Sequence, residues 1–168
     1  IAGDIQKNYH TMVLHIEKAK ELDCDLIVFP EMCLPGYFIG DTWEQQFFLK
    51  KCEEYHEKIA SLSKGIAIIF GSVGIDWKNK NEDGRVRKYN AAFCAYKGKL
   101  VANKKTKFYF WAKALLPNYR EFDDSRHFFD LRKLAFEKKK SINQLYEPFN
   151  LTIKNKKFSI GICICEDS

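Results

Sequence analysis

The segment DLIVFPEMCLPGY, residues 25–37, decides the fold class of this 168-residue chain. Its apolar residues LIVF predict a short buried strand, and Pro30 ends that strand because proline lacks the amide hydrogen that a sheet requires. Glu31 therefore lies just past the carboxyl end of the strand, and Gly36 then turns the chain. The segment predicts a strand followed at once by an acidic side chain and a turn.

Two helices are predicted around this strand. Apolar residues of NYHTMVLHIEKAKEL, residues 8–22, recur at helical spacing, and Asn8 is the expected N-cap. The sequence DTWE at Asp41–Glu44 fits a capping box, which predicts a second helix that runs to about Ser63. The first 63 residues are thus predicted to hold a helix, a strand and a second helix.

Strand patterns dominate from Gly65 onward. IAIIFGSVGI at 66–75 predicts a buried strand, and the polar DWKNKNEDGRVRK that follows predicts a hairpin-like excursion. YNAAFCAY and KLVAN, residues 89–96 and 99–103, are two further predicted strands, separated by a turn at Lys97–Gly98. This order of elements predicts an α/β fold with helices packed on a sheet.

The last third of the chain contains a long loop and a hairpin. Residues 104–126 show no clean period, and long loops inside a compact domain are usually functional. LTIKNKKFSIGICIC, residues 151–165, predicts a hairpin that turns at Asn155. The hairpin should end in an alternating strand on which Cys163 and Cys165 share one face.

Composition favours a single soluble domain. Hydrophobic residues make up 46% of the chain, enough for a substantial core. The uncharged run Ile66–Ile75 is about half the length that a membrane helix needs, so we expect no membrane span and a cytoplasmic protein. The net charge of +6 comes from lysine clusters without a nucleic-acid-binding motif, so we interpret them as a solvated face and expect no nucleic-acid partner.

The six cysteines are expected to be reduced. Four of them, Cys24, Cys94, Cys163 and Cys165, lie in or beside apolar runs, unlike the loop-rich cysteine framework of small secreted proteins. Cys163 and Cys165 form one C-x-C pair, but the sequence has no second pair at zinc-like spacing, so no metal site is predicted.

Three residues could together hydrolyse an amide. That reaction needs a nucleophile, a base for its proton and a positive or hydrogen-bonding group for the developing oxyanion. Cys165, Glu31 and Lys113 offer these groups if the fold brings them together. On spacing alone, Glu31 could equally be a strand-end carboxylate, Lys113 a solvated lysine and Cys165 a small core residue.

Four segments resemble a known family. DLIVFPEMCLPGY, KALLPNYREFDDSRHF and GICICEDS are similar to the three signature segments of the nitrilase (carbon–nitrogen hydrolase) superfamily, and GDIQKN resembles the start of its members. The resemblance is closest to the glutaminase domain of glutamine-dependent NAD synthetase. It implies an α-β-β-α sandwich, and we expect residues 1–168 to be an incomplete carbon–nitrogen hydrolase domain within a longer polypeptide, without the synthetase domain.

The resemblance assigns roles to particular residues. Glu31 is implied as the general base, Cys165 as the nucleophile and Lys113 as the lysine that stabilises the tetrahedral intermediate. Lys107 is an alternative in the same loop, but Lys113 keeps the family's offset to the Leu-Pro-Asn-Tyr run. Glu121 is implied as a supporting carboxylate beside the lysine. The implied glutamine-recognition residues are Tyr37, Tyr119, Phe122 and Glu166.

The implied activity is hydrolysis of L-glutamine to glutamate and ammonia through a cysteine thioester. The resemblance implies no cofactor for this half, and ATP and magnesium only in the synthetase domain, which would be the partner in the full-length protein. We also expect a homo-oligomer. Two alternatives stay open: a stand-alone amidase acting on another small amide, which the complete open reading frame would test, and a non-catalytic module, which labelling of Cys165 by a glutamine-like electrophile would test.

Overall fold

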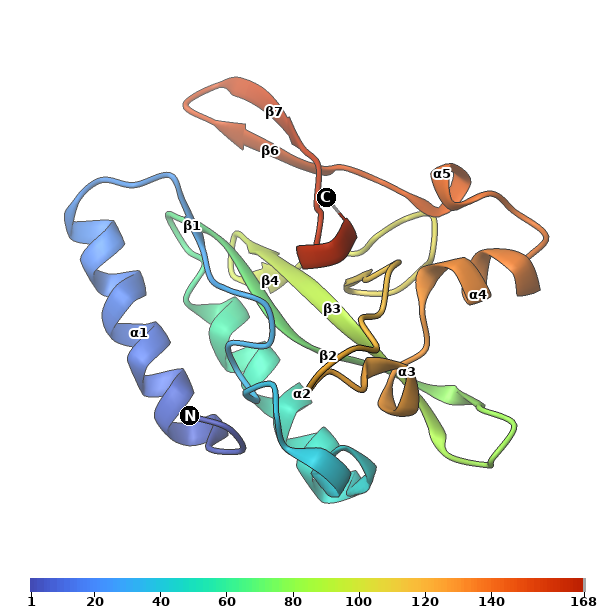
Figure 1. The fold of residues 1–168 in the computed structure, drawn as a ribbon. Helices are drawn as coiled ribbons and strands as arrows, with labels where there is room; N and C mark the ends of the chain where they lie inside the picture. The colour runs from blue at the N-terminus through green and yellow to red at the C-terminus, as the bar shows by residue number, and fades with distance from the viewer. Residues whose placement is uncertain (168) are drawn as a thin grey trace.

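The structure, a computed structural model, describes residues 1–167 (Figure 1). Ser168, the last residue of the GICICEDS segment, lies outside the described residues. The helices are α1 (Ile5–Glu21), η1 (Gly40–Glu44), α2 (Gln46–Ser61), α3 (Asp124–His127), α4 (Leu131–Glu137), α5 (Ile142–Leu145) and η2 (Cys165–Asp167). The strands are β1 (Leu26–Val28), β2 (Ala67–Lys80), β3 (Val86–Tyr96), β4 (Lys99–Leu100), β5 (Trp111–Ala112), β6 (Phe149–Ile153) and β7 (Lys156–Ile160).

A five-stranded sheet forms the centre of the molecule. β1 pairs with β2 in parallel, with Leu26 opposite Ala67, and the connection between them runs through α2, because parallel neighbours need a crossover. β2 and β3 form a long antiparallel hairpin in which Gly71 lies opposite Ala92. β4 and β5 both pair with β3. This arrangement confirms the predicted α/β class.

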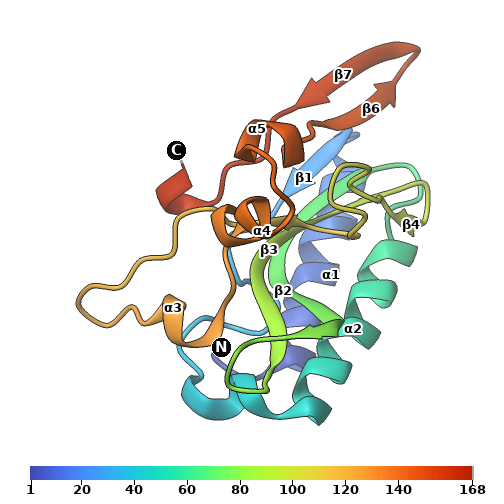
Figure 2. The ribbon, with the colours of Figure 1, turned by 90° about the vertical axis from the view of Figure 1, so that its right-hand side faces the viewer.

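The helices α1 and α2 cover one face of the sheet (Figure 2). Each helix buries one side, and the apolar residues between them and the sheet form the main core. Central members of this core are Met12, Ile16, Leu49, Ile59, Ile68, Phe70 and Phe93. This packing fixes β1 and β2 in place, and with them the turn that follows β1.

A smaller core lies on the opposite face. Ala67 and Ile69 of β2 alternate with the residues that face the helices, and they pack with Phe149 and Leu151 of β6. β6 and β7 form a separate two-stranded sheet that extends beyond the central one (Figure 1). Helices, central sheet and hairpin sheet are thus in the α-β-β order of the expected sandwich.

Both predicted helix starts were wrong. Asp4 caps α1 by accepting a hydrogen bond from the Lys7 amide at 3.0 Å, whereas Asn8 is buried within the helix and donates to the Leu34 carbonyl at 2.9 Å. The DTWE segment forms the short helix η1 instead of a capping box, and α2 begins after it without a side-chain cap. Local capping patterns were overridden here by tertiary contacts.

The strand boundaries also differ from the prediction. β2 continues to Lys80 and β3 begins at Val86, so the predicted hairpin-like excursion forms the tip of the β2–β3 hairpin, with a register shift between Asp76 and Lys80. The turn at Lys97–Gly98 and the hairpin turn at Asn155 are confirmed. The alternating strand expected to reach Cys165 ends at Ile160, so the two cysteines do not share a strand face.

Candidate active site

Glu31 lies in a tight turn packed against β2. The amide of Phe29 donates to the Ile69 carbonyl at 2.8 Å, which carries the β1–β2 pairing up to the turn. Met32, directly after Glu31, has a φ of 51°. Gly71 of β2 lies under this turn, where a Cβ atom would collide with the backbone of residues 30–32. A glycine on the neighbouring strand therefore allows the carboxylate to sit close to the sheet.

Lys113 is fully buried beside Glu31. It follows β5, and its amide donates to the Asn90 carbonyl of β3 at 2.9 Å. Its Nζ lies 2.6 Å from Glu31 Oε1 and 3.9 Å from Asp124 Oδ2, with the lysine side chain wholly inaccessible to solvent. The fold therefore brings the predicted base and the predicted lysine into direct contact, although they are 82 residues apart.

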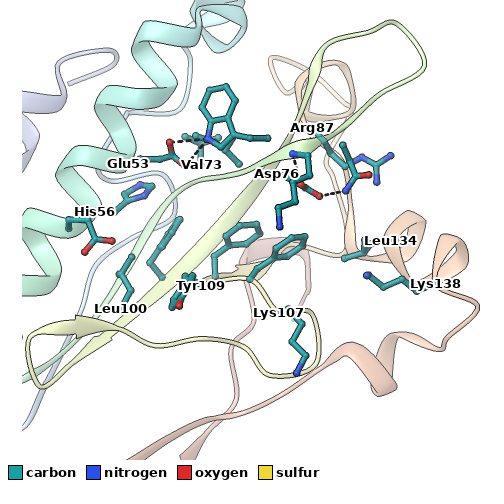
Figure 3. A pocket seen from close by; sticks show the side chains of 18 of the residues that line it. Glu53, His56, Val73, Asp76, Arg87, Leu100, Lys107, Tyr109, Leu134 and Lys138 are labelled. Carbon is teal, nitrogen blue, oxygen red and sulfur yellow. Dashed lines mark hydrogen bonds between the residues drawn. The ribbon is translucent and has the colours of Figure 1, made fainter.

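The alternative Lys107 belongs to another part of the molecule. It is exposed and lines a separate cavity of about 640 Å³ between α2, β2 and α4. Figure 3 shows Lys107 in this cavity with Glu53 and His56. Among the residues that the structure describes, the lining of this cavity includes neither Glu31 nor Cys165. This placement favours Lys113 over Lys107 as the lysine of the site.

Asp124, and not the predicted Glu121, is the carboxylate beside Lys113. Asp124 is buried, whereas Glu121 is exposed, and no hydrogen bond or ion pair within residues 1–167 joins Glu121 to Lys113. The Tyr37 hydroxyl donates to both Asp124 carboxylate oxygens at 2.8 and 2.9 Å. Burial raises the pKa of Asp124, and the hydrogen bond from Tyr37 and the charge of Lys113 oppose that rise.

Asn90 is the second residue that sequence reasoning missed. Its Nδ2 donates to Glu31 Oε1 at 2.7 Å and to Asp124 Oδ2 at 3.3 Å. A signal was present, because Asn90 is a polar residue in the otherwise apolar run NAAFCAY, and a buried polar side chain requires partners. Asp124 carried no comparable signal, since several acidic residues follow one another in its loop.

Cys165 lies in the turn η2, with a φ of 51° and an exposed side chain. It lines a cavity of about 270 Å³ together with Glu31. Asp167, in the same turn, accepts the amide hydrogens of Ala114 and Leu115 at 3.0 and 2.8 Å. The turn that carries the cysteine is thus attached directly to the segment that follows Lys113.

The four predicted recognition residues also lie together. The ring of Phe122 lies 5.5 Å from that of Tyr37 and 5.6 Å from that of Tyr119, and the Tyr119 hydroxyl donates to Glu166 at 2.5 Å. Burial raises the pKa of Tyr37, the hydrogen bond and charge of Asp124 add to the rise, and Glu31 and Cys165 contribute less, which places both of them near the Tyr37 ring. Phe38, which the sequence did not single out, adds a ring 5.5 Å from Phe122. An aromatic wall therefore borders the cysteine.

The site carries no pattern of metal ligands or membrane insertion. Within residues 1–167, no group of three or more His, Cys, Asp or Glu side chains is arranged to hold a metal ion. None of the described helices has the length and apolar character required to cross a membrane.

Comparisons with known proteins find similar sequences over nearly the whole chain. The family model for carbon–nitrogen hydrolases matches residues 1–168. The glutamine-dependent NAD(+) synthetase of Thermotoga maritima is 28% identical over 167 residues, covering 98% of this chain and 23% of the relative. That of Aquifex aeolicus is 27% identical over 96% of this chain and 23% of the relative. The chain thus spans about a quarter of the length of these curated relatives.

Solved structures show the same fold. The glutamine-dependent NAD+ synthetase of Acinetobacter baumannii superposes with a TM-score of 0.66 at 27% identity, covering 96% of this chain and 25% of that one. An amidase of the nitrilase superfamily from Nesterenkonia superposes with a TM-score of 0.61 at 18% identity, over 94% of this chain and 50% of that one. The similarity to the amidase concerns the fold alone. Together the two superpositions confirm the nitrilase-type architecture.

Proposed function

The chain belongs to the carbon–nitrogen hydrolase family, and from that premise we propose that it hydrolyses L-glutamine to glutamate and ammonia. The observation that carries the proposal is the buried contact of 2.6 Å between Glu31 and Lys113, with Cys165 on the same cavity as Glu31. A carboxylate, an ammonium and a thiol are the three groups that amide hydrolysis by a thioester route requires. The similarity to glutamine-dependent NAD synthetases supports glutamine as the amide.

In the first half-reaction, Glu31 takes the proton from the Cys165 thiol, and the thiolate attacks the side-chain amide carbon of glutamine. The amide oxygen gains the negative charge, which Lys113 stabilises. The protonated Glu31 then gives its proton to the amide nitrogen, the carbon–nitrogen bond breaks and ammonia leaves. A glutamyl thioester on Cys165 remains.

In the second half-reaction, Glu31 takes a proton from water, and the resulting hydroxide attacks the thioester carbon. Lys113 again stabilises the oxyanion, the carbon–sulfur bond breaks and glutamate is released. The proton held by Glu31 returns to the Cys165 thiolate, which restores the starting state. Only this chain's own side chains take part.

The aromatic wall supports recognition of an amino acid. Tyr37, Tyr119 and Phe122 would enclose the aliphatic part of glutamine, and Glu166 provides a carboxylate for its α-ammonium group. The hydrogen bond from Tyr119 holds that carboxylate in place.

We further propose that the ammonia serves a synthetase activity of the kind that the curated relatives are named for. ATP and magnesium would act in that activity, and no step of the hydrolysis proposed above involves them. A homo-oligomer and a cytoplasmic location are part of the same proposal.

Replacement of the cysteine tests the proposed function. The product of the complete open reading frame should release ammonia from glutamine, Cys165→Ala should not, and the matched variant Cys163→Ala should keep the parent activity. A diazo-ketone analogue of glutamine should label the parent at Cys165 as measured by mass spectrometry of peptides. Turnover by Cys165→Ala above about a thousandth of the parent rate would exclude Cys165 as the nucleophile. Labelling without glutamine turnover would favour another small amide as the substrate.

A further inference from the structure

Asn90 contacts Glu31, Lys113 and Asp124, the three charged residues at the centre of the site. It lies in the middle of β3 and is completely buried. Its backbone carbonyl accepts the amide hydrogen of Lys113 at 2.9 Å, and its side-chain Nδ2 donates to Glu31 at 2.7 Å and to Asp124 at 3.3 Å. The turn after β1 and the segments that carry Lys113 and Asp124 are thus attached to one residue of the central strand β3.

The charges explain why an amide is suited to this position. Glu31 and Asp124 are two carboxylates that share the single buried ammonium of Lys113, and like charges at short range repel each other. The NH₂ group of asparagine has two hydrogens and no charge, so it can bind both carboxylates without adding to the repulsion. Its Oδ1 accepts no hydrogen bond from the described residues, which makes a purely stabilising role a poor explanation.

The contacts also distinguish the two oxygens of Glu31. Lys113 Nζ and Asn90 Nδ2 both donate to Oε1, at 2.6 and 2.7 Å. Two donors on one oxygen fix the rotation of the carboxylate and direct the other oxygen, Oε2, away from the lysine. A general base must have its accepting oxygen within reach of the proton that it removes.

We propose that Asn90 is a positioning residue that fixes Glu31 so that Oε2 receives the Cys165 proton while Lys113 stays available for the oxyanion. This proposal rests on the proposed function. Without Asn90, Glu31 can turn and bind Lys113 through both oxygens, and the base and the oxyanion-binding group then neutralise each other. The step affected is the transfer of the thiol proton from Sγ to Oε2, with the sulfur electron pair becoming the nucleophile.

The test compares Asn90→Ala with Asn103→Ala in the product of the complete open reading frame. Asn103 is a matched control because it is also buried and uses its side chain for hydrogen bonds, but its Oδ1 accepts the amides of Lys105 and Thr106, outside the site. Asn90→Ala should lower kcat for glutamine at least about tenfold with KM changed less than about threefold. Asn103→Ala should lower the melting temperature but keep kcat within about twofold for the folded protein.

A second readout does not depend on glutamine. Alkylation of Cys165 by iodoacetamide at pH 7, followed by peptide mass spectrometry, should slow in Asn90→Ala by a factor similar to the loss in kcat. Asn90→Asp should react more slowly than Asn90→Ala at pH 8 and approach it at pH 6, because the introduced carboxyl loses its charge and can donate when protonated. A merely structural role would not produce this pH dependence.

The outcomes separate the two proposals. If the parent does not turn over glutamine but Asn90→Ala still slows alkylation, the substrate is wrong and the positioning role stands. If the parent is active and Asn90→Ala alkylates at the parent rate, or loses no more kcat than Asn103→Ala, the positioning role is wrong. An inactive parent with unchanged alkylation in Asn90→Ala would reject both.

Discussion

Replacement of Lys113 by methionine removes a buried charge while it keeps a side chain of similar length. In the parent, Nζ is 2.6 Å from Glu31 and 3.9 Å from Asp124, and the Asp124 side chain is only 3% exposed. Loss of the lysine therefore leaves two carboxylates close together with the Asn90 amide as their common partner. Removal of one member of a buried ion pair costs about 3–5 kcal/mol of the free energy of unfolding.

This loss of stability should depend on pH. Burial already raises the pKa of Asp124 above its ordinary value of 3.8, and the lysine charge opposes that rise, so the variant should have a higher Asp124 pKa than the parent. A carboxyl whose pKa is raised in the folded state favours folding below its unfolded-state pKa and ceases to do so as the pH rises through the folded value. The free energy of unfolding that Lys113→Met loses relative to the parent should therefore be largest at neutral pH and become smaller towards pH 4.

Lys88→Met provides the control for a buried lysine. Lys88 is 1% exposed and lies 2.5 Å from Glu44, which contacts His127 rather than the catalytic residues. Urea unfolding of the two variants should show losses of the same order. Ammonia release at saturating glutamine should fall by about 10²- to 10³-fold only in Lys113→Met, as expected for loss of one oxyanion donor.

The reasoning would be refuted by either of two results. Lys113→Met could retain more than about a tenth of the parent kcat, which would exclude it from transition-state stabilisation. Alternatively, Lys88→Met could lose as much kcat as Lys113→Met after correction for the folded fraction. The loss of activity in Lys113→Met would then come from the loss of a buried lysine in general and not from oxyanion stabilisation.

Three further predictions concern other parts of the site and core. Asp124→Asn should lower kcat at least about tenfold because Lys113 loses one of its carboxylates, whereas kcat of Glu121→Gln should stay within about twofold of the parent. If steady-state kinetics give the reverse order, Glu121 is the carboxylate that supports the lysine. Tyr119→Phe should raise KM for glutamine more than it lowers kcat, because the carboxylate of Glu166 loses its hydrogen bond; an effect on kcat alone would move Tyr119 into the chemistry. Burial lowers the pKa of His56 from 6.5 to about 3, so the native state excludes a proton that the unfolded chain binds below pH 6.5. The free energy of unfolding should therefore fall by about 2 kcal/mol from pH 7 to pH 5 on this account, and urea titrations should show a smaller fall for His56→Leu.

The sequence predicted the class of fold because its strongest patterns are local. Pro30 ends β1 and places Glu31 at the carboxyl end of a strand, and this consequence of proline chemistry does not depend on the rest of the chain. The family resemblance then selected Lys113, which the structure places beside Glu31.

The remaining errors arose where tertiary contacts decide. Glu121 and Asp124 are three positions apart in a stretch of sequence without periodicity, and Arg120, with a φ of 54°, reverses the backbone just before them. Sequence spacing cannot tell which of two such carboxylates turns inward. Asn90 was missed for a related reason, since its partners lie on segments 59 and 34 residues away.

The left-handed backbone at Met32 and Cys165 has an evolutionary consequence. Met32 directly follows Glu31, Cys165 carries the thiol, and both have a φ near 51°. A non-glycine residue in this left-handed region of backbone conformation lowers the stability of the fold by about 1–2 kcal/mol. Glycine at position 165 would relieve that cost and remove the thiol at the same time. At Met32, which is buried in the main core, the loss of packing would outweigh that relief. A lineage that kept the fold but no longer needed the reaction would therefore gain stability by losing its nucleophile, and descendants without activity should drift towards glycine or asparagine at position 165 while residue 32 stays large and apolar.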